Sequence, residues 1–355
     1  MRVSIAVMDR RTIMFLRSLW KGLFGRNTAP EFIVDPGNHK VPTAAGLLVL
    51  VDPPASIDLG LLESQFYEVL FDSPIEDAEL NVPQKLVLDA VKFTLSDPDQ
   101  RSNCVPQLPA VIPRLMRSLR DAGTSGKDYI NIINKDPVLS AAVVRLANSA
   151  YYNHSTVHIE SIDRAVIKLG VDGLRSVLSA AVMQPIIQRN SPYFNQFGLK
   201  LWQHSLCCAV TCELLASREA LEPYKAYLLG LAHDLGKITI FSELCKQFKL
   251  NSPDDRPGCK VFVPLIKDYS NQLSARIAQD WDLPNNLCLA LNQQVLIGEG
   301  KPVGDYARIL YRANLACEFY AAGGHEHPEN AANMIAELDL PADLFQTLGS
   351  LAVEI

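Results

Sequence analysis

The sequence contains no uninterrupted apolar run close to the ~20 residues that a membrane-spanning helix requires. It also has no low-complexity segment and no internal repeat. Of its 355 residues, 48% are hydrophobic and 20% are charged, which excludes a disordered chain, a collagen-like repeat and a small disulfide-stapled protein. The net charge is −6 without a basic run. We therefore expect no binding to duplex nucleic acid, because contacts to phosphates dominate that binding.

Cys-x-x-Cys pairs are absent too, although the chain contains eight cysteines. Their absence argues against a zinc ribbon or a thioredoxin-like redox site. Several of the cysteines lie in apolar helical stretches, where cysteine acts as a small hydrophobic residue. No clear signal peptide is visible, since charges interrupt the N-terminal apolar stretch and no small-residue cleavage site follows it. Together these observations predict a protein of the reducing cytoplasm.

Residues 1–26 differ from the rest of the chain in charge. They contain six basic residues against one acidic residue, a net charge of +5, which leaves −11 for the remainder. Ile13, Leu16, Trp20 and Leu23 recur at helical spacing, which is typical of a basic amphipathic helix in peripheral contact with a membrane or a partner. The alternative is a disordered tail or a start site further along the chain.

The remainder divides into three parts by its pattern. Residues 27–104 form an accessory region of unknown fold, with a short strand or buried segment before residue 52 and helices over 59–70 and 82–95. Residues 105–300 form a helical domain, and residues 301–355 supply C-terminal helices that complete its bundle. The predicted fold class is mainly all-α, a multi-helix bundle whose small N-terminal region leaves an α+β arrangement open.

Several of the predicted helices have readable ends. Asp136 and Ser161 are typical N-caps, and Pro137 suits a first helical position. Gly170 ends the helix that Ser161 begins, and a further helix is predicted over residues 171–188. The apolar spacing predicts further helices at about 198–217, 223–235, 263–282, 284–294, 303–322, 328–338 and 341–354.

Candidate metal ligands lie at the polar ends of apolar helical stretches. His233 and Asp234 follow the apolar run that begins at Leu228, and His204 lies near the start of an earlier helix. Imidazole and carboxylate together suit one divalent Fe, Mn or Zn ion, and adjacent helices of a bundle can bring such groups together. The alternative is a pair of hydrogen-bonded structural histidines without a metal.

These residues resemble the first metal ligands of the HD superfamily of metal-dependent phosphohydrolases. Four upstream segments narrow the resemblance to the HDOD family, the HD-related output domains of bacterial signalling proteins: Gln107-Leu-Pro-Ala-Val-Ile-Pro113, Lys135-Asp-Pro-Val-Leu139, Val144-Arg-Leu-Ala-Asn-Ser-Ala-Tyr-Tyr152 and Ser161-Ile-Asp-Arg-Ala-Val-Ile-Lys-Leu-Gly170. The resemblance runs from about residue 105 to about residue 300. It implies an HD-like helical bundle and a role in signal transduction.

The chain departs from the catalytic members of the superfamily at two places. Asn314 stands where the resemblance implies the closing Asp ligand, and an amide is the weaker ligand for a hard cation. Gln293 and Gln294 stand where related families carry a His-His pair, and the Gly-Tyr-Pro motif of cyclic-dinucleotide phosphodiesterases is absent from the sequence. The resemblance thus implies a residual site of His204, His233, Asp234 and Asn314.

Other candidate residues have simpler interpretations. Lys237 is a candidate phosphate contact, but we favour a cation that interacts with the dipole at a helix C-terminus. We favour buried packing for the three cysteines near His204, which are Cys207, Cys208 and Cys212. We favour an exposed loop for His325 and His327. His154 and His158 have no assigned role.

Two functional interpretations remain open on these residues. The first is a non-catalytic bacterial signal-transduction protein whose helical domain binds a protein partner or a small ligand such as a nucleotide. The second is a metal-dependent phosphohydrolase that acts on a nucleotide or phosphate ester. In the second, Asn314, water or another acid such as Asp305 completes the ligand set of the ion.

Overall fold

Helices make up nearly all the regular structure in the part of the chain that the structure describes. The computed structural model describes residues 48–75, 79–107, 126–153, 155, 157–189, 191–252, 254 and 257–352. Within these ranges no strand is present, and the only sheet-like pairing is one antiparallel bridge between Val49 and Val303. The predicted all-α fold class is therefore confirmed. The tail of residues 1–26 lies outside the described residues.

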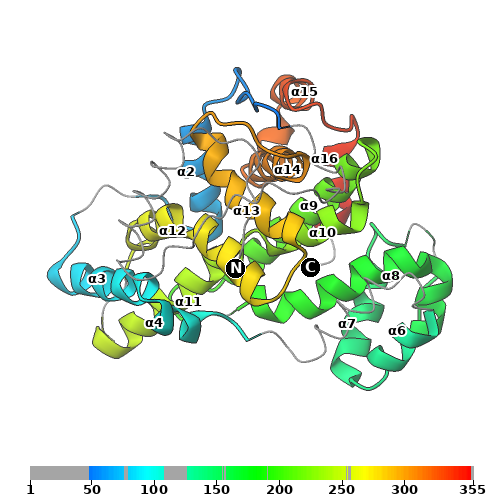
Figure 1. Cartoon of the computed structure of the whole chain (residues 1–355), viewed down its shortest axis with the longest axis horizontal. Coiled ribbons are helices and arrows are strands. Elements are labelled where there is room, and N and C mark those ends of the chain that lie inside the picture. The colour runs from blue at the N-terminus through cyan, green and yellow to red at the C-terminus, as the bar shows by residue number, and fades with distance from the viewer. Residues whose placement is uncertain are drawn as a thin grey trace, which may run out of the picture. The chain divides into compact units, whose positions relative to one another are not determined.

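Figure 1 shows the arrangement of the described helices. Their bounds are α2 Leu59–Phe71, α3 Val82–Ser96, α4 Pro98–Cys104, α6 Gly126–Ile133, α7 Pro137–Ala147, α8 Ile162–Ile187, α9 Phe197–Arg218, α10 Pro223–Ala232, α11 Leu235–Asn251, α12 Cys259–Asp280, α13 Asn285–Gly298, α14 Asp305–Ala321, α15 Pro328–Glu337 and α16 Leu344–Ala352, with a 3-10 turn at Gly324–Glu326.

The predicted caps are confirmed at the start of two helices. Asp136 accepts hydrogen bonds from the backbone N–H groups of Val138 and Leu139, and Ser161 accepts one from Arg164. Gly170 has a φ of +67°, so the helical conformation breaks there and α8 consists of two helical segments. This break agrees with the two helices that the sequence predicts on either side of Gly170.

Helix α11 is a feature that the sequence pattern did not predict. The expected helix over 223–235 ends at Ala232, and α11 begins three residues later at Leu235. Apolar and polar residues of α11 alike are buried, including Ile238, Thr239 and Glu243. A helix that is enclosed on most sides has a weak amphipathic pattern, so periodicity gave no signal for it.

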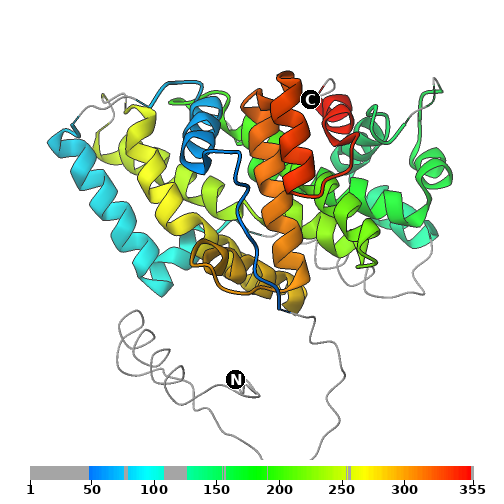
Figure 2. The ribbon, with the colours of Figure 1, turned by 90° about the horizontal axis from the view of Figure 1, so that it is seen from above.

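Helix α9 lies at the centre of the described part. It packs against α2, α8, α10, α14 and α16 (Figure 1). Figures 1 and 2 both show α3 and α4 at one end of the helices and α6, α7 and α8 at the other. Among the described helices, none has the length and apolarity to cross a membrane.

Two glycines allow helices to approach closely around α10 and α11. A Cβ atom on Gly230 of α10 would lie 2.5 Å from the backbone of Ala209 in α9. A Cβ atom on Gly236 of α11 would lie 2.0 Å from the carbonyl oxygen of Ser270 in α12. Both distances are shorter than real side chains allow, so these helix pairs depend on glycine.

Gly230→Ala tests the close contact of α9 and α10. We expect it to lower the free energy of unfolding by about 2 kcal/mol, because the added methyl group forces the two backbones apart. The measurement is guanidinium unfolding followed by circular dichroism. Gly298→Ala is the matched control, since a Cβ atom there meets nothing within 4 Å. Equal stability of both variants would contradict the expectation.

Candidate metal centre

His204 lies on the buried central helix α9, with 3% of its surface exposed. The ring of Phe66 from α2 packs on its imidazole, with 4.5 Å between the ring centroids. The sulfur of Cys208, one turn further along α9, lies 3.5 Å from His204 Nε2. His204 Nδ1 is buried and has no hydrogen-bond partner among the described residues. Nε2 is therefore the ring nitrogen through which His204 contacts the other polar residues of the cluster.

His233 and Asp234 form the connection between α10 and α11. The Nδ1 atom of His233 lies 2.7 Å from the carbonyl oxygen of Gly230 and donates its hydrogen to it. Asp234 occupies the N-cap position of α11, but its carboxylate makes no capping hydrogen bond. Instead its oxygens lie 3.3 Å from His233 Nε2 and 3.5 Å from His204 Nε2. The connection thus directs two ligand-type side chains at His204.

Asn314 on α14 completes the cluster. Its Oδ1 atom lies 3.1 Å from the Nε2 atoms of both His204 and His233. Its Nδ2 atom donates to the carboxylate of Glu318 at 2.9 Å, which fixes the orientation of the amide. The four predicted ligands therefore come together, and Asn314 stands in the closing position that the resemblance implied.

Asp305 does not enter this cluster. It is the first residue of α14 and pairs with Arg308 at 3.3 Å. Nine residues separate it from Asn314 along the helix, a distance of about 13 Å. Gln293 and Gln294 also have structural partners, since Gln293 accepts from the backbone of Gly304 and Gln294 donates to the backbone of Ala307.

Burial sets the protonation of the cluster. It lowers the pKa of His204 to about 3 and also lowers the pKa of His233, so both imidazoles are neutral at pH 7. Burial alone would raise the pKa of Asp234, but the adjacent His233 imidazole and the Lys237 ammonium group outweigh this effect and lower the pKa. Because the imidazoles are neutral, the charge that keeps Asp234 ionised is the ammonium group of Lys237.

Lys237 forms a buried ion pair with Asp234. Its Nζ atom lies 2.8 Å from Asp234 Oδ1, and the Asp234 carboxylate raises its pKa despite the opposing effect of burial. The expectation that Lys237 interacts with a helix C-terminus was wrong, because the residue lies in the first turn of α11. A cation there is unfavourable for the helix dipole, so the ion pair with Asp234 explains its position.

Acceptor atoms converge in the cluster without enough hydrogens between them. With Nδ1 protonated, His233 presents a lone pair at Nε2, and it faces Asn314 Oδ1, which is another acceptor. Asp234 Oδ2 is buried and has no hydrogen-bond partner among the described residues. Such an arrangement favours a cation, and the donor set of two imidazoles, a carboxylate and an amide suits one divalent ion.

Cys208 adds a sulfur atom to this donor set. The ligand atoms of His204, Cys208 and His233 lie within 4.8 Å of one another. Burial raises the pKa of the Cys208 thiol, so its ionisation would require a bound cation. The packing role predicted for Cys207, Cys208 and Cys212 agrees with their burial, but it omitted the contact of Cys208 with His204.

Two groups in the site were missed by the sequence reasoning. Phe66 covers His204, and Lys237 Nζ lies 5.2 Å from the centre of the same ring. Glu318 supports Asn314 from one helical turn away, and burial raises its pKa to about 7. The spacing of four residues to Asn314 is a signal that could have identified Glu318, whereas no pattern in the sequence linked α2 to the cluster.

The other histidines within the described ranges lie apart from the cluster. His325 stacks on Tyr320, with 4.2 Å between the ring centroids, and its Nδ1 atom contacts the backbone oxygen of that residue. His327 caps the start of α15 through its backbone. His158 lies on the rim of an open cavity beside α7, and His154 lies outside the described residues.

Comparisons with known proteins agree with this architecture. A family model described as the HDOD domain matches residues 105–295. An HDOD domain protein with unknown function from Geobacter sulfurreducens superposes with a TM-score of 0.53 at 20% identity, covering 76% of this chain and 99% of that one. A protein from Shewanella amazonensis SB2B, named "putative metal-dependent phosphohydrolase", gives a TM-score of 0.55 at 19% identity over 76% and 98% of the two chains. At such identities the likeness concerns the fold.

Lys237→Met tests the buried ion pair. We expect it to lower the free energy of unfolding by about 3 kcal/mol, because Asp234 remains buried without its counter-charge. The double variant Lys237→Met, Asp234→Asn should regain more than half of the loss in denaturant unfolding. Lys267→Met breaks a more exposed pair with Glu63 and should cost at most about 1 kcal/mol. A double variant no more stable than Lys237→Met would refute this explanation.

Asn314→Asp tests the acceptor cluster as a cation site. We expect it to tighten Zn²⁺ binding by about tenfold or more, since even outer-shell partners change metal affinity by 10–100-fold. His204→Ala and His233→Ala should weaken binding in the same competition titration with a chromogenic chelator. Asn292→Asp, an exposed change on α13, serves as the control. Unchanged affinity in all three cluster variants would argue that the cluster holds no ion.

Proposed function

The chain belongs to the HDOD domain family, and on that premise we propose that it is a bacterial signal-transduction protein that regulates by binding rather than by catalysis. Its helical domain binds a protein partner or a small ligand. In this proposal His204, His233, Asp234 and Asn314 hold one zinc, iron or manganese ion, which supplies a cross-link between α9, α11 and α14 when bound.

The covering of the cluster is the observation that carries this proposal. His204, His233, Asp234 and Lys237 are 3%, 8%, 2% and 7% exposed, respectively. Metal-assisted hydrolysis requires a water molecule and a phosphoryl oxygen to reach the ion. Phe66 packs on His204, and the Asp234 carboxylate is neutralised by Lys237. Phe66 thus blocks the approach of a substrate to His204, and the ion pair occupies a carboxylate oxygen that would otherwise bind the metal ion.

The origin of this cover supports a regulatory role further. Phe66 belongs to α2, which precedes the segment matched by the family model. Lys267 of α12 pairs with Glu63 of α2 at 2.7 Å, and Lys200 of α9 pairs with Asp72 beyond its end at 2.8 Å. A helix from outside the family domain is therefore fixed over the cluster by charged contacts at both ends.

Exposed apolar residues on α3 support binding to a protein partner. Val82, Leu86 and Phe93 are 69%, 65% and 63% exposed, and their spacing of four and seven residues places them on one stripe of the helix. Large apolar side chains gathered on one exposed face are typical of surfaces that contact other proteins.

Metal-dependent phosphohydrolysis is the second candidate function, because the convergent acceptors favour a cation. A hydrolysis screen of p-nitrophenyl phosphate, bis-p-nitrophenyl phosphate and nucleotides with added Mn²⁺ separates the two functions. We expect the wild-type rate to equal that of His233→Ala, because the covered cluster admits no substrate. Turnover that is present in the wild type and lost in His233→Ala would overturn the regulatory proposal.

The same hydrolysis screen also tests the effect of removing the Phe66 ring that covers His204. Phe66→Ala opens space above His204, and the expected result is still no turnover, because Lys237 and Asn314 remain in place. Leu61→Ala, an exposed change on α2, is the matched control for effects of the helix itself. Turnover gained by Phe66→Ala alone would show a catalytic centre that α2 inhibits.

A further inference from the structure

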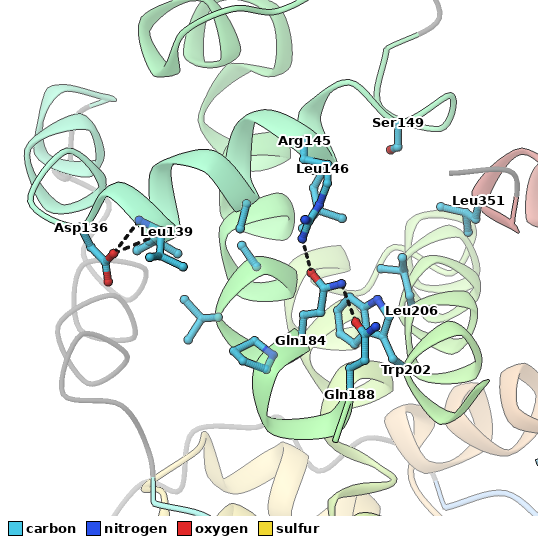
Figure 3. A pocket seen from close by; sticks show the side chains of 15 residues that line it. Asp136, Leu139, Arg145, Leu146, Ser149, Gln184, Gln188, Trp202, Leu206 and Leu351 are labelled. Carbon is cyan, nitrogen blue, oxygen red and sulfur yellow. Dashed lines mark hydrogen bonds between the residues drawn. The ribbon is translucent and has the colours of Figure 1, made fainter. Parts of the chain in front are cut away.

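A cavity of about 480 Å³ lies on the far side of α9 from the metal centre, between α7, α8, α9 and α16 (Figure 3). Its wall is largely apolar, and the volume falls in the range that small-molecule sites occupy. Its apolar lining includes Ala142 and Leu146 of α7, Trp202 and Leu206 of α9 and Leu351 of α16. Val138 is 80% exposed, so apolar surface remains open to solvent beside the cavity.

Two polar atoms of the wall are buried without a partner. The indole nitrogen of Trp202 is a hydrogen-bond donor on a fully buried side chain, and neither it nor the Ser149 hydroxyl has a hydrogen-bond partner among the described residues. A buried donor without an acceptor costs about 1–3 kcal/mol, so nearly all such groups in proteins are paired. Both atoms lie beneath the surface of the wall, since almost none of either atom is exposed, so they do not decide what the cavity binds.

One side of the cavity carries a positive charge. Arg145 donates to Gln184 at 3.0 Å, and Gln184 donates to Gln188 at 2.8 Å, which gives the row of three side chains in Figure 3. No described carboxylate lies within ion-pair distance of Arg145. Asp136, the acidic residue of the lining, already accepts two backbone hydrogen bonds as the cap of α7. The guanidinium is therefore available to an anion.

We propose that this cavity binds a small amphipathic carboxylate, with its apolar body against the aliphatic wall and its carboxylate at Arg145. Carboxylate oxygens are acceptors, which matches the N–H groups of the exposed Arg145 guanidinium at the wall of the cavity. A nucleotide with two or three phosphates fits less well, because Arg145 is the single cation among the described residues that line the cavity. The inference goes beyond the proposed function and does not depend on a metal at His204.

The test is a binding titration of the full chain with decanoate, decan-1-ol and ATP as probes. Displacement of 8-anilinonaphthalene-1-sulfonate fluorescence reports the affinity of each probe. We expect decanoate to bind about tenfold more tightly than decan-1-ol, because the charged head adds charge-assisted hydrogen bonds. ATP should not compete. Tighter binding of ATP than of decanoate, or equal affinity of the acid and the alcohol, would overturn the proposed ligand class.

Variants place the binding in this cavity. Arg145→Gln should remove the advantage of decanoate over decan-1-ol, while Ala142→Phe, which fills the cavity, should reduce the affinity for both. Arg164→Gln changes an exposed arginine of α8 that pairs with Glu160, and it should leave both affinities unchanged. Thermal unfolding confirms that each variant is folded. Binding that is indifferent to both Arg145→Gln and Ala142→Phe would place the probes elsewhere and refute the inference.

Discussion

The close approach of α9 and α10 is the constraint on which the site depends. Gly230 lies against the backbone of Ala209, where any side chain would collide. The same Gly230 offers its carbonyl oxygen to His233 Nδ1, which fixes the tautomer of that ring and turns Nε2 toward His204. One glycine thus sets both the spacing of two helices and the direction of a ligand lone pair. Fixed helix packing brings residues 29 positions apart into one cluster.

Electrostatics within this packing explains why the cluster is stable while buried. A carboxylate enclosed among apolar groups is costly unless a charge partner is present. Lys237 supplies that partner one turn along α11, and Phe66 covers the pair from outside. Asp234 Oδ2 has no hydrogen-bond partner among the described residues, while His233 Nε2 and Asn314 Oδ1 both lie within hydrogen-bond distance of the same His204 Nε2 atom. The cluster therefore contains the ion pair of Lys237 with Asp234, and its remaining acceptor atoms still favour a bound cation.

The sequence predicted the members of this cluster better than its surroundings. His204, His233 and Asp234 were visible as ligand-type residues at the ends of apolar helical stretches, and the resemblance to the HD superfamily then singled them out and pointed to Asn314. Helix α11 was not predicted from the sequence, because a helix enclosed on most sides has no apolar stripe. The packing of Phe66 on His204 was not predicted for another reason, because local sequence patterns carry no information about which distant helix packs over a site. Hydrophobic periodicity indicates which face of a helix is buried, but it does not indicate which other helix packs against that face.

Helix α9 presents the two candidate sites on opposite sides. Trp202 and Leu206 line the cavity, whereas His204 and Cys208 face the metal centre. Residues two positions apart point about 200° from each other on a helix, so the alternation along α9 requires this arrangement. A molecule in the cavity can influence the centre only if α9 has two packings that bind the molecule with different affinity. Because α9 is enclosed by five other helices, a shift that relieves one face must change the contacts of the other.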